Sequence, residues 1–485
     1  MALLIGDVLR HAARVTPRRT AATLGDGSLT FGALDERANR VAHALSRMGV
    51  SHGDRVAWWG DTSLEAVPLF FALAKLGAVF APVNARLGAD EAAEVIGYAR
   101  PRLLLVDPAH AELVEGIDVP VLTHAALDEA ASRASASDVH APTLDERDPH
   151  VIFFTSGSTG RSKGVVLSHR ANYLRSFPPL AADTGRAGGT VCMFPLFHMA
   201  GWSLGLGCWQ ARRALHLVRA PDAETLLDEV EQRHAARIYL IPAVWARVLE
   251  HGTTGRDLAS LEEADTGTSA TPPELVATIR DALPHTVTRI FYGSTEAGAG
   301  TVLAHHDLDR KPGSVGLPQP GVDVRLSDDG EVCIDSDLLM DGYFELPDAT
   351  AEALRDGWYH TGDVGVFDDE GYLSIIGRVR DVIRTGGETV APGEVERALA
   401  THRAVDDVAV IGLPDPHWGE IVCAVVVPAA GHAVDLESLR RHSRERLAAF
   451  KQPRRLELLD ALPRTPATGQ VQRTLLVERL ASRTT

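Results

Sequence analysis

The chain has 485 residues, of which 45% are hydrophobic and 23% are charged. This length and balance predict a globular protein with a large core and at least two domains, rather than a disordered chain. The formal net charge of −17 argues against nucleic acid as the main partner, because that role requires clustered positive charge.

Cysteine usage and hydropathy suggest a cytoplasmic protein. Four cysteines are widely spaced and form no C-x-x-C pair, so a disulfide or zinc framework is unsupported: Cys192, Cys208, Cys333 and Cys423. The N-terminus does not resemble a secretory signal. The most apolar stretch, 66–83, contains Pro68 and Lys75 and falls short of a membrane span.

Helical and strand patterns alternate in the part of the chain before Pro318. Apolar residues recur at helical spacing over 31–48 and 64–76. Short apolar runs predict buried strands at 55–58, 78–83, 103–106, 151–154 and 237–241. This alternation predicts α/β layers with mainly parallel sheets. The Ala-, Ser- and Asp-rich stretch 130–148 is expected to be a surface connection.

The pattern changes after Pro318. Short strands are expected at 322–326, 331–334 and 372–376, separated by Asp-Gly or Glu-Gly turns that are typical of hairpins. The tail has its own alternation, with helices at 392–399 and 436–447 and strands at 407–413 and 421–427. It is long enough to form a small domain. We therefore predict a core domain at 1–377 and a C-terminal domain at 378–485.

The strongest local signal follows the strand 151–154, where the sequence reads Thr155-Ser-Gly-Ser-Thr-Gly-Arg-Ser-Lys-Gly164. Glycines allow tight turns that expose N–H groups, while hydroxyls and a lysine add donors and positive charge, so the loop can wrap a polyphosphate. The Walker A spacing does not fit. A flexible linker is the alternative, but linkers rarely separate two apolar strands. The candidate phosphate-binding residues are Thr155, Ser156, Gly157, Ser158, Thr159, Gly160 and Lys163.

Three later segments add polar groups that suit a nucleotide. Phe291-Tyr-Gly-Ser-Thr-Glu-Ala-Gly298 reads as a strand entering a turn, where Thr295 and Glu296 can offer oxygens to phosphate and magnesium. Tyr359-His-Thr-Gly-Asp363 supplies a carboxylate able to accept hydrogen bonds from both ribose hydroxyls. Gly377-Arg-Val-Arg-Asp381 lies at the predicted domain boundary, where Arg378 can contact a phosphate. Taken singly, each of these signals is weak.

The order and spacing of the four segments resemble the core motifs of the adenylate-forming superfamily, which includes acyl-CoA synthetases, peptide-synthetase adenylation domains and luciferases. The resemblance covers essentially the whole chain and is closest to bacterial fatty or aryl acyl-CoA synthetases. Further matching segments include Leu76-Gly-Ala-Val-Phe-Ala-Pro-Val83, Phe194-Pro-Leu-Phe-His198 and Trp418-Gly-Glu420. The resemblance implies a large N-terminal domain of layered α/β subdomains with a small β-barrel-like subdomain, followed by a small mobile α+β C-terminal lid.

The same resemblance implies a reaction. ATP would convert a small acid into an acyl-adenylate with release of pyrophosphate, and coenzyme A would then take the acyl group as a thioester. ATP, Mg²⁺ and coenzyme A are the implied cofactors. The loop 155–164 would hold the β- and γ-phosphates, and Thr295 would contact phosphate. Glu296 would bind Mg²⁺ together with Thr155.

The remaining roles also come from the resemblance. Asp363 would hold the ribose, Arg378 would contact phosphate, and the C-terminal domain would rotate about Arg380. His198 would lie at the acyl pocket near the path of the thiol. Tyr292 and the turn Gly267-Thr268-Ser269-Ala270 would flank adenine, and Gly293 and Ser294 would be further cofactor-binding residues. The other acyl-pocket residues would be Trp202, Trp245 and Gly298. For His198 and the two tryptophans, ordinary core packing is the alternative.

One position departs from the family pattern. In Pro463-Arg-Thr-Pro-Ala-Thr-Gly-Gln-Val-Gln-Arg473, Gln470 stands where the family has a catalytic lysine. That lysine stabilises charge during adenylate formation, whereas thiol attack does not need it. Loss of one such stabiliser commonly costs on the order of 10²–10³-fold in rate. Three explanations are open: a deliberate Lys→Gln change, another cation with the extra residue Ala467 shifting the loop, or a substrate that is not an ordinary carboxylate.

Several alternative functions follow. A branch of the family uses ATP and nitrite to diazotise aromatic amines, and Gln470 also allows a nucleotide-binding pseudoenzyme. Gly201-Trp-Ser-Leu-Gly205 fits the serine hydrolase pattern, although a nucleophile elbow requires a strand directly before the serine. The acid remains open among fatty, aryl and short acids, as does the acceptor among coenzyme A, a carrier protein and an amine. A homodimer is also left open.

Overall fold

The computed structural model describes residues 2–156, 162–176, 188–385, 388–444, 446–464 and 470–481. The chain divides into two compact units. Unit 1 comprises Met1–Pro312, Pro318–Asp323 and Asp335–Tyr359, and unit 2 comprises Gly313–Leu317, Val324–Ile334 and His360–Thr485. The functional boundary at 377/378 and the hinge at Arg380 concern movement of the C-terminal part, and both stay predictions.

The first sheet of unit 1 contains the strands predicted in the N-terminal part of the chain. Its order is β18-β8-β7-β4-β3-β5-β6, in which β7, β4, β3, β5 and β6 are parallel and β8 returns antiparallel beside β7. The strands are β3 (Arg55–Trp59), β4 (Val79–Val83), β5 (Leu103–Val106), β6 (Val121–Thr123), β7 (Pro149–Ser156), β8 (Ser162–Ser168) and β18 (Gly342–Tyr343).

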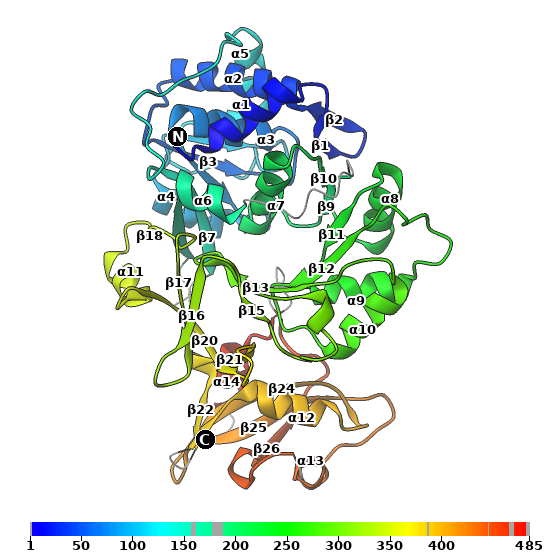
Figure 1. Cartoon of the computed structure of the whole chain (residues 1–485). Coiled ribbons are helices and arrows are strands. Elements are labelled where there is room, and N and C mark those ends of the chain that lie inside the picture. The colour runs from blue at the N-terminus through cyan, green and yellow to red at the C-terminus, as the bar shows by residue number, and fades with distance from the viewer. Residues whose placement is uncertain are drawn as a thin grey trace. The chain divides into compact units, whose positions relative to one another are not determined.

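The second sheet of unit 1 is also mainly parallel. Its strands follow the order β14-β13-β12-β11-β9-β10-β1-β2, with antiparallel hairpins at the two ends of this series. Helices α8, α9 and α10 lie beside β11 and β12, in green in Figure 1. The strands are β1 (Thr20–Leu24), β2 (Gly27–Thr30), β9 (Thr190–Cys192), β10 (Leu215–Leu217), β11 (Arg237–Tyr239), β12 (Glu263–Gly267), β13 (Ile290–Ser294) and β14 (Gly298–Leu303).

The helices of unit 1 cover these sheets. The central one, α3, is buried over its whole length and ends at Gly77, whose φ of +71° suits a glycine cap. The helices are α1 (Ile5–Val15), α2 (Phe31–Arg47), α3 (Ala66–Leu76), α4 (Ala89–Ala99), α5 (His124–Ser132), α6 (His169–Arg175), α7 (Met199–Gln210), α8 (Ala223–Arg233), α9 (Pro242–His251), α10 (Pro273–Ala282) and α11 (Pro347–Ala353).

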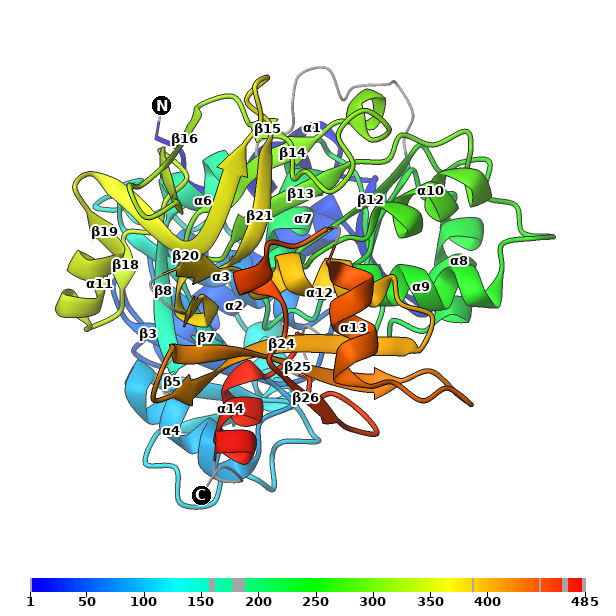
Figure 2. The same ribbon diagram turned by 90° about the horizontal axis from the view of Figure 1, so that it is seen from below.

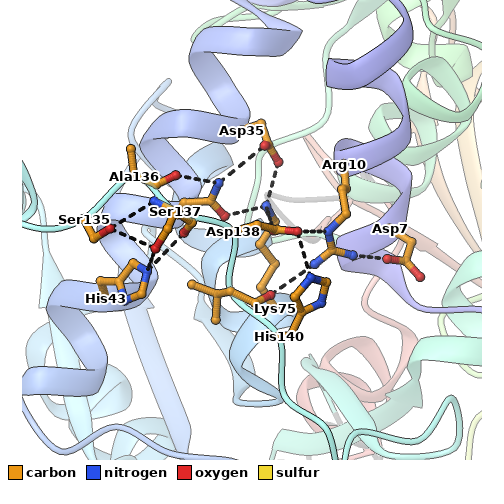
Figure 3. Close-up of polar contacts among 12 residues, drawn as sticks. Asp7, Arg10, Asp35, His43, Lys75, Ser135, Ala136, Ser137, Asp138 and His140 are labelled. Atoms are coloured by element: carbon orange, nitrogen blue, oxygen red, sulfur yellow. Dashed lines mark hydrogen bonds and ion pairs between the residues drawn. The ribbon is translucent and has the colours of Figure 1, made fainter.

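Lys75, the charged residue of α3, is fully buried and is neutralised by a polar network. Its Nζ donates to Asp35 Oδ1 and Asn39 Oδ1 at 2.6 Å each and lies 3.4 Å from Asp138 Oδ1. Asp138 also accepts from Arg10 at 2.6 Å (Figure 3). The stretch 130–148 is therefore not only a surface connection, because Asp138 anchors it against α1 and α3.

Unit 2 contains a small sheet and the C-terminal α+β part. In the small sheet, β16 (Val322–Leu326) and β17 (Glu331–Ser336) precede β20 (Trp358–Phe367), which pairs antiparallel with β21 (Leu373–Arg378). The two-residue strand β19 (Leu354–Arg355) pairs antiparallel with the start of β20, whereas β15 (Leu317–Pro318) is the edge strand next to β14 in the second sheet. This arrangement corresponds to the barrel-like part predicted after Pro318.

The C-terminal part is a sheet with helices on both faces. Helices α12 and α13 lie on one face and α14 on the other (Figure 2). Alternate residues of β24 and β25 face either α12 and α13 or α14, as the two separate core clusters show. The elements are β22 (Ile383–Thr385), β23 (Glu388–Val390), α12 (Pro392–Ala400), β24 (Val405–Asp415), β25 (Gly419–Pro428), α13 (Leu436–Ser443), β26 (Arg455–Leu458) and α14 (Arg473–Ala481).

These elements confirm the predicted α/β fold class. The helix expected at 436–447 is shorter and ends at Ser443. Within the described part of the chain, no helix is both long and apolar enough to cross a membrane. The four cysteines are buried free thiols, in agreement with the prediction that they form no disulfides.

Candidate active site

The predicted phosphate loop lies at the end of a β-hairpin. Strands β7 and β8 pair antiparallel up to Ser156 and Ser162, with Thr155 opposite Lys163. Thr155 Oγ1 lies 3.4 Å from the Lys163 carbonyl oxygen, to which it donates. Gly157, Ser158, Thr159 and Gly160 lie outside the described residues. The hairpin therefore brings the two ends of the predicted loop together, as a loop that wraps a polyphosphate requires.

Tyr343 links Lys163 to Glu296. The Lys163 ammonium lies 4.7 Å from the centre of the Tyr343 ring, and the Tyr343 hydroxyl donates to Glu296 Oε1 at 3.1 Å. Burial, and then the nearby Glu296 carboxylate, raises the pKa of Tyr343. Tyr343 is placed there because β18 pairs with β8, where Tyr343 is opposite Val165. Sequence reasoning missed Tyr343, and the only signal was a Gly-Tyr pair distant from the recognised segments.

Arg175 holds the turn that carries Thr295 and Glu296. Its guanidinium donates to the carbonyl oxygens of Leu338, Thr295 and Glu296 at 2.6, 2.7 and 2.7 Å. Burial lowers the pKa of Arg175 to about 10. The side chain passes Gly298, where an added Cβ would lie 3.1 Å from Arg175 Cγ. Gly298 is thus needed for the packing of Arg175, in addition to the pocket role expected from the sequence.

The turn predicted to flank adenine lies at the carboxyl ends of parallel strands. Strands β11, β12 and β13 are neighbours and end at Tyr239, Gly267 and Ser294. Ligands of open α/β sheets bind at this edge. The structure therefore brings the predicted segment Gly267–Ser269 beside the predicted segment Tyr292–Ser294. Ser294 Oγ also accepts the Ala297 N–H at 3.1 Å, which closes the turn between β13 and β14.

His198 caps the helix α7. Its Nδ1 accepts the Ala200 N–H at 3.2 Å, and its ring stacks on Phe194 with centroids 6.0 Å apart. Burial lowers the pKa of His198 to about 4, so the imidazole is neutral near pH 7. A neutral His198 with Nδ1 as acceptor carries its proton on Nε2. The structure thus shows the packing contact that was the alternative to a pocket role.

The two tryptophans assigned to the acyl pocket lie in the core. Trp202 stacks on Phe70 with centroids 4.1 Å apart and donates its indole N–H to the Leu196 carbonyl oxygen. Trp245 donates to the Asp265 carbonyl oxygen at 2.9 Å. Both side chains are fully buried with satisfied N–H groups. This placement favours the core interpretation of Trp202 and Trp245.

In unit 2, the predicted ribose and phosphate residues form an ion pair. Asp363 and Arg378 are opposite each other on β20 and β21, and Arg378 Nε lies 2.7 Å from Asp363 Oδ1. Arg380 lies in the 3-10 turn Val379–Asp381 that follows β21. Asp363 and Arg378 come from separate sequence segments, and their close contact supports the interpretation that both bind the same ligand.

Gln470 is exposed and lies just before α14. Three residues later, Arg473 pairs with Glu396 of α12 at 2.7 Å and lies 3.6 Å from Asp381. These contacts tie the segment after Gln470 to the turn that contains Arg380. The extra residue Ala467 lies outside the described residues.

A second polar cluster was not predicted. The ligand-type atoms of Glu331, Cys333 and His360 lie within 4.8 Å of one another. His360 Nδ1 is 2.8 Å from Glu331 Oε2, and the Gly362 N–H donates to Glu331 Oε1 at 2.9 Å. These hydrogen bonds explain the cluster as a link between β17 and β20 without a metal.

The serine hydrolase alternative does not fit the structure. Ser203 lies inside α7, and its hydroxyl contacts Met199 Sδ at 2.9 Å within the same helix. A nucleophile elbow needs a serine on a turn between a strand and a helix.

Comparisons with known proteins agree with this geometry. The profile described as AMP-binding enzyme matches residues 9–344, and the profile described as AMP-binding enzyme C-terminal domain matches residues 394–468. A feruloyl-CoA synthase of an Amycolatopsis species is 35% identical over 95% of both chains. A long-chain fatty acid–CoA ligase of Mycobacterium tuberculosis is 33% identical over 99% of both. The solved structure of ATP-bound MatB from Rhodopseudomonas palustris has a TM-score of 0.90 at 28% identity and covers 100% of both chains.

Proposed function

The chain belongs to the AMP-binding enzyme family and is an ATP-dependent acid–thiol ligase that uses Mg²⁺ and coenzyme A, and we propose that its acid carries an aromatic ring. The reaction has two successive displacements, the first at the α-phosphorus of ATP and the second at the acyl carbon. A carboxylate oxygen attacks the α-phosphorus of ATP and pyrophosphate leaves. The thiol of coenzyme A then attacks the acyl carbonyl carbon, and AMP leaves.

The proposed roles of the residues follow the sequence motifs and are supported by the contacts in each unit. The hairpin end with Thr155 and Lys163 would hold the β- and γ-phosphates. Glu296, with the Thr155 hydroxyl, supplies the hard oxygen ligands that Mg²⁺ prefers. When bound there, Mg²⁺ would neutralise phosphate charge. Asp363 would accept hydrogen bonds from the ribose, and Arg378 would contact phosphate.

An aromatic cluster carries the proposal about the acid. Phe194 packs on His198 and Tyr239 at 6.0 and 5.4 Å, and Tyr239 packs on Phe291 at 5.9 Å between ring centroids. These rings pack on one another at the spacing of aromatic pairs, and an aromatic acid beside them would gain contacts of the same kind. The feruloyl-CoA synthase is one relative whose named substrate has this chemistry, and an indoleacetate–CoA ligase of Aromatoleum aromaticum is another. A fatty acid is the second candidate, since a fatty acid–CoA ligase is nearly as similar.

A pyrophosphate-release screen tests the proposal. Aryl, fatty and short acids are each offered with ATP and Mg²⁺, and aminoaryl acids are also offered with nitrite. We expect the highest kcat/KM for an aryl acid, with formation of its CoA thioester. Higher kcat/KM for a fatty acid would refute the aromatic assignment, and nitrite-dependent turnover would favour diazotisation. ATP binding without any turnover would indicate a pseudoenzyme.

A second experiment tests the role of position 470 in the same assay. We expect Gln470→Lys to accelerate the adenylation half-reaction, on the order of 10²–10³-fold if the amide is merely a weak substitute for an ammonium. Thioester formation from a supplied acyl-adenylate should change little. Gln472→Lys is the matched control, because it adds the same charge two residues away. Equal effects of the two variants would show a general charge effect and refute a specific role of position 470.

Cytoplasmic localisation and a homodimer remain further proposals. The four buried free thiols support a reducing compartment. Light scattering coupled to size-exclusion chromatography measures the assembly, and a mass of about one chain at micromolar concentration would refute the dimer.

A further inference from the structure

A threonine at the predicted adenine turn adopts a backbone conformation that threonine rarely adopts. Thr268 has a φ of +71°. Among the described residues other than glycine that have a positive φ, it is the one with a β-branched side chain. Such a residue is an outlier in backbone conformation. The preceding Gly267 has a φ of +145°, and a Cβ there would lie 2.2 Å from the Phe291 carbonyl oxygen. Strand β13 therefore confines the backbone directly before Thr268.

Tyr239 supplies the contact that holds this conformation. Its hydroxyl oxygen lies 3.1 Å from Thr268 Oγ1. Tyr239 ends β11, which pairs in parallel with β12, and its ring is fixed between Phe194 and Phe291. Tyr239 is buried while Thr268 is exposed. A rigid hydroxyl in the core thus fixes an exposed residue at the ligand-binding edge of the sheet.

We propose that Tyr239 is a positioning residue for ATP, whose hydroxyl keeps Thr268 in the left-handed conformation that shapes the turn against adenine. The inference rests on the proposed function, which assigns the turn 267–269 to the nucleotide. Strained backbone persists where the surroundings over-determine it, and such positions cluster at ligand sites. One hydrogen bond of this kind changes a conformational equilibrium about two- to tenfold. The effect on ATP affinity should have the same size.

The test uses Tyr239→Phe, which keeps the ring and removes the hydroxyl. We expect the dissociation constant and KM for ATP to rise about two- to tenfold. Adding Thr268→Gly to Tyr239→Phe should restore ATP affinity, because glycine adopts a positive φ without a partner. Asp356→Gly is the matched control. Asp356 is another exposed residue of unit 1 with positive φ, +55°, and its replacement should not restore affinity.

The inference would be overturned by unchanged ATP affinity in Tyr239→Phe, or by an affinity loss that Thr268→Gly does not repair. Repair by Asp356→Gly would also overturn it, since that result points to general stability. Calorimetric titration of ATP needs no turnover. An enzyme inactive with every acid would therefore contradict the proposed function while the titration still decides the role of Tyr239.

Discussion

Replacing Arg175 with methionine tests whether one side chain holds the turn of Thr295 and Glu296. Methionine keeps most of the length and apolar stem of arginine but cannot donate to the three carbonyl oxygens that Arg175 now contacts. Loss of these donors should loosen the turn 295–296 from Leu338. Because Glu296 is the proposed Mg²⁺ ligand, a looser turn should weaken MgATP binding as well as the fold.

The expected change in the free energy of unfolding of Arg175→Met follows from two opposing contributions. Hydrogen bonds from a charged donor contribute about 1.5–3 kcal/mol each, so three contribute about 5–9 kcal/mol. Burial of the guanidinium lowers the pKa of Arg175 from its ordinary value to about 10, which corresponds to a cost of about 3 kcal/mol. The expected loss in free energy of unfolding is therefore about 4 kcal/mol.

Urea unfolding followed by tryptophan fluorescence measures this loss, since Trp202 and Trp209 are buried in the same unit. Arg170→Met is the matched control on the same helix. Arg170 forms partly exposed ion pairs with Glu146 and Asp337, and such pairs contribute at most about 1 kcal/mol. Kinetics should show a KM for MgATP about tenfold higher in Arg175→Met. Equal unfolding midpoints for the two variants would refute the reasoning.

Three further predictions concern the stability and chemistry of unit 1. Lys75→Met should lower the free energy of unfolding by about 3–5 kcal/mol, because it leaves buried acceptors without their cation; thermal denaturation checks this, and an unchanged midpoint would contradict it. Burial lowers the pKa of His169 to about 4, so the folded protein favours the neutral ring. The contribution of this ring to the free energy of unfolding is fully present above pH 6.5 and is lost as the pH falls toward 4. The loss is roughly 2 kcal/mol at pH 5. Unfolding measured from pH 7 to 5 should therefore depend less on pH in His169→Gln, and identical slopes would exclude His169 as the cause. Ser203→Ala should leave pyrophosphate release unchanged, whereas loss of activity would revive a role for the serine hydroxyl.

The local parts of the site were predictable from the sequence because they depend on neighbouring residues. The strand before the loop 155–164 and the apolar run after it were recognisable in the sequence, and the structure shows that they form β7 and β8, which pair antiparallel. The turn after β13 follows from glycines beside hydroxyl residues. Asp363 and Arg378 were predicted separately, and their pairing follows from the antiparallel register of β20 and β21.

The residues that hold the site were not predictable in the same way. Arg175 contacts backbone carbonyl oxygens that lie more than a hundred residues further along the chain. Every residue has such an oxygen, so the sequence does not indicate which ones Arg175 contacts. Tyr343 reaches Glu296 only because a two-residue strand joins the edge of a distant sheet. For Trp202 and Trp245 the sequence left two interpretations open, since their apolar character could not distinguish a pocket wall from the core.

The candidate ATP contacts are already paired with other protein groups, and this has a consequence for binding. Glu296 accepts from Tyr343, Lys163 lies over the same ring, and Asp363 pairs with Arg378. Internal partners avoid the cost of leaving charged groups buried without contacts. In the proposed complex, ATP would exchange these contacts for its own, so its affinity would reflect a difference between two sets of polar interactions. A variant that removes only the internal partner, such as Tyr343→Phe, should then weaken the fold while affecting ATP affinity less than a change at Glu296 itself.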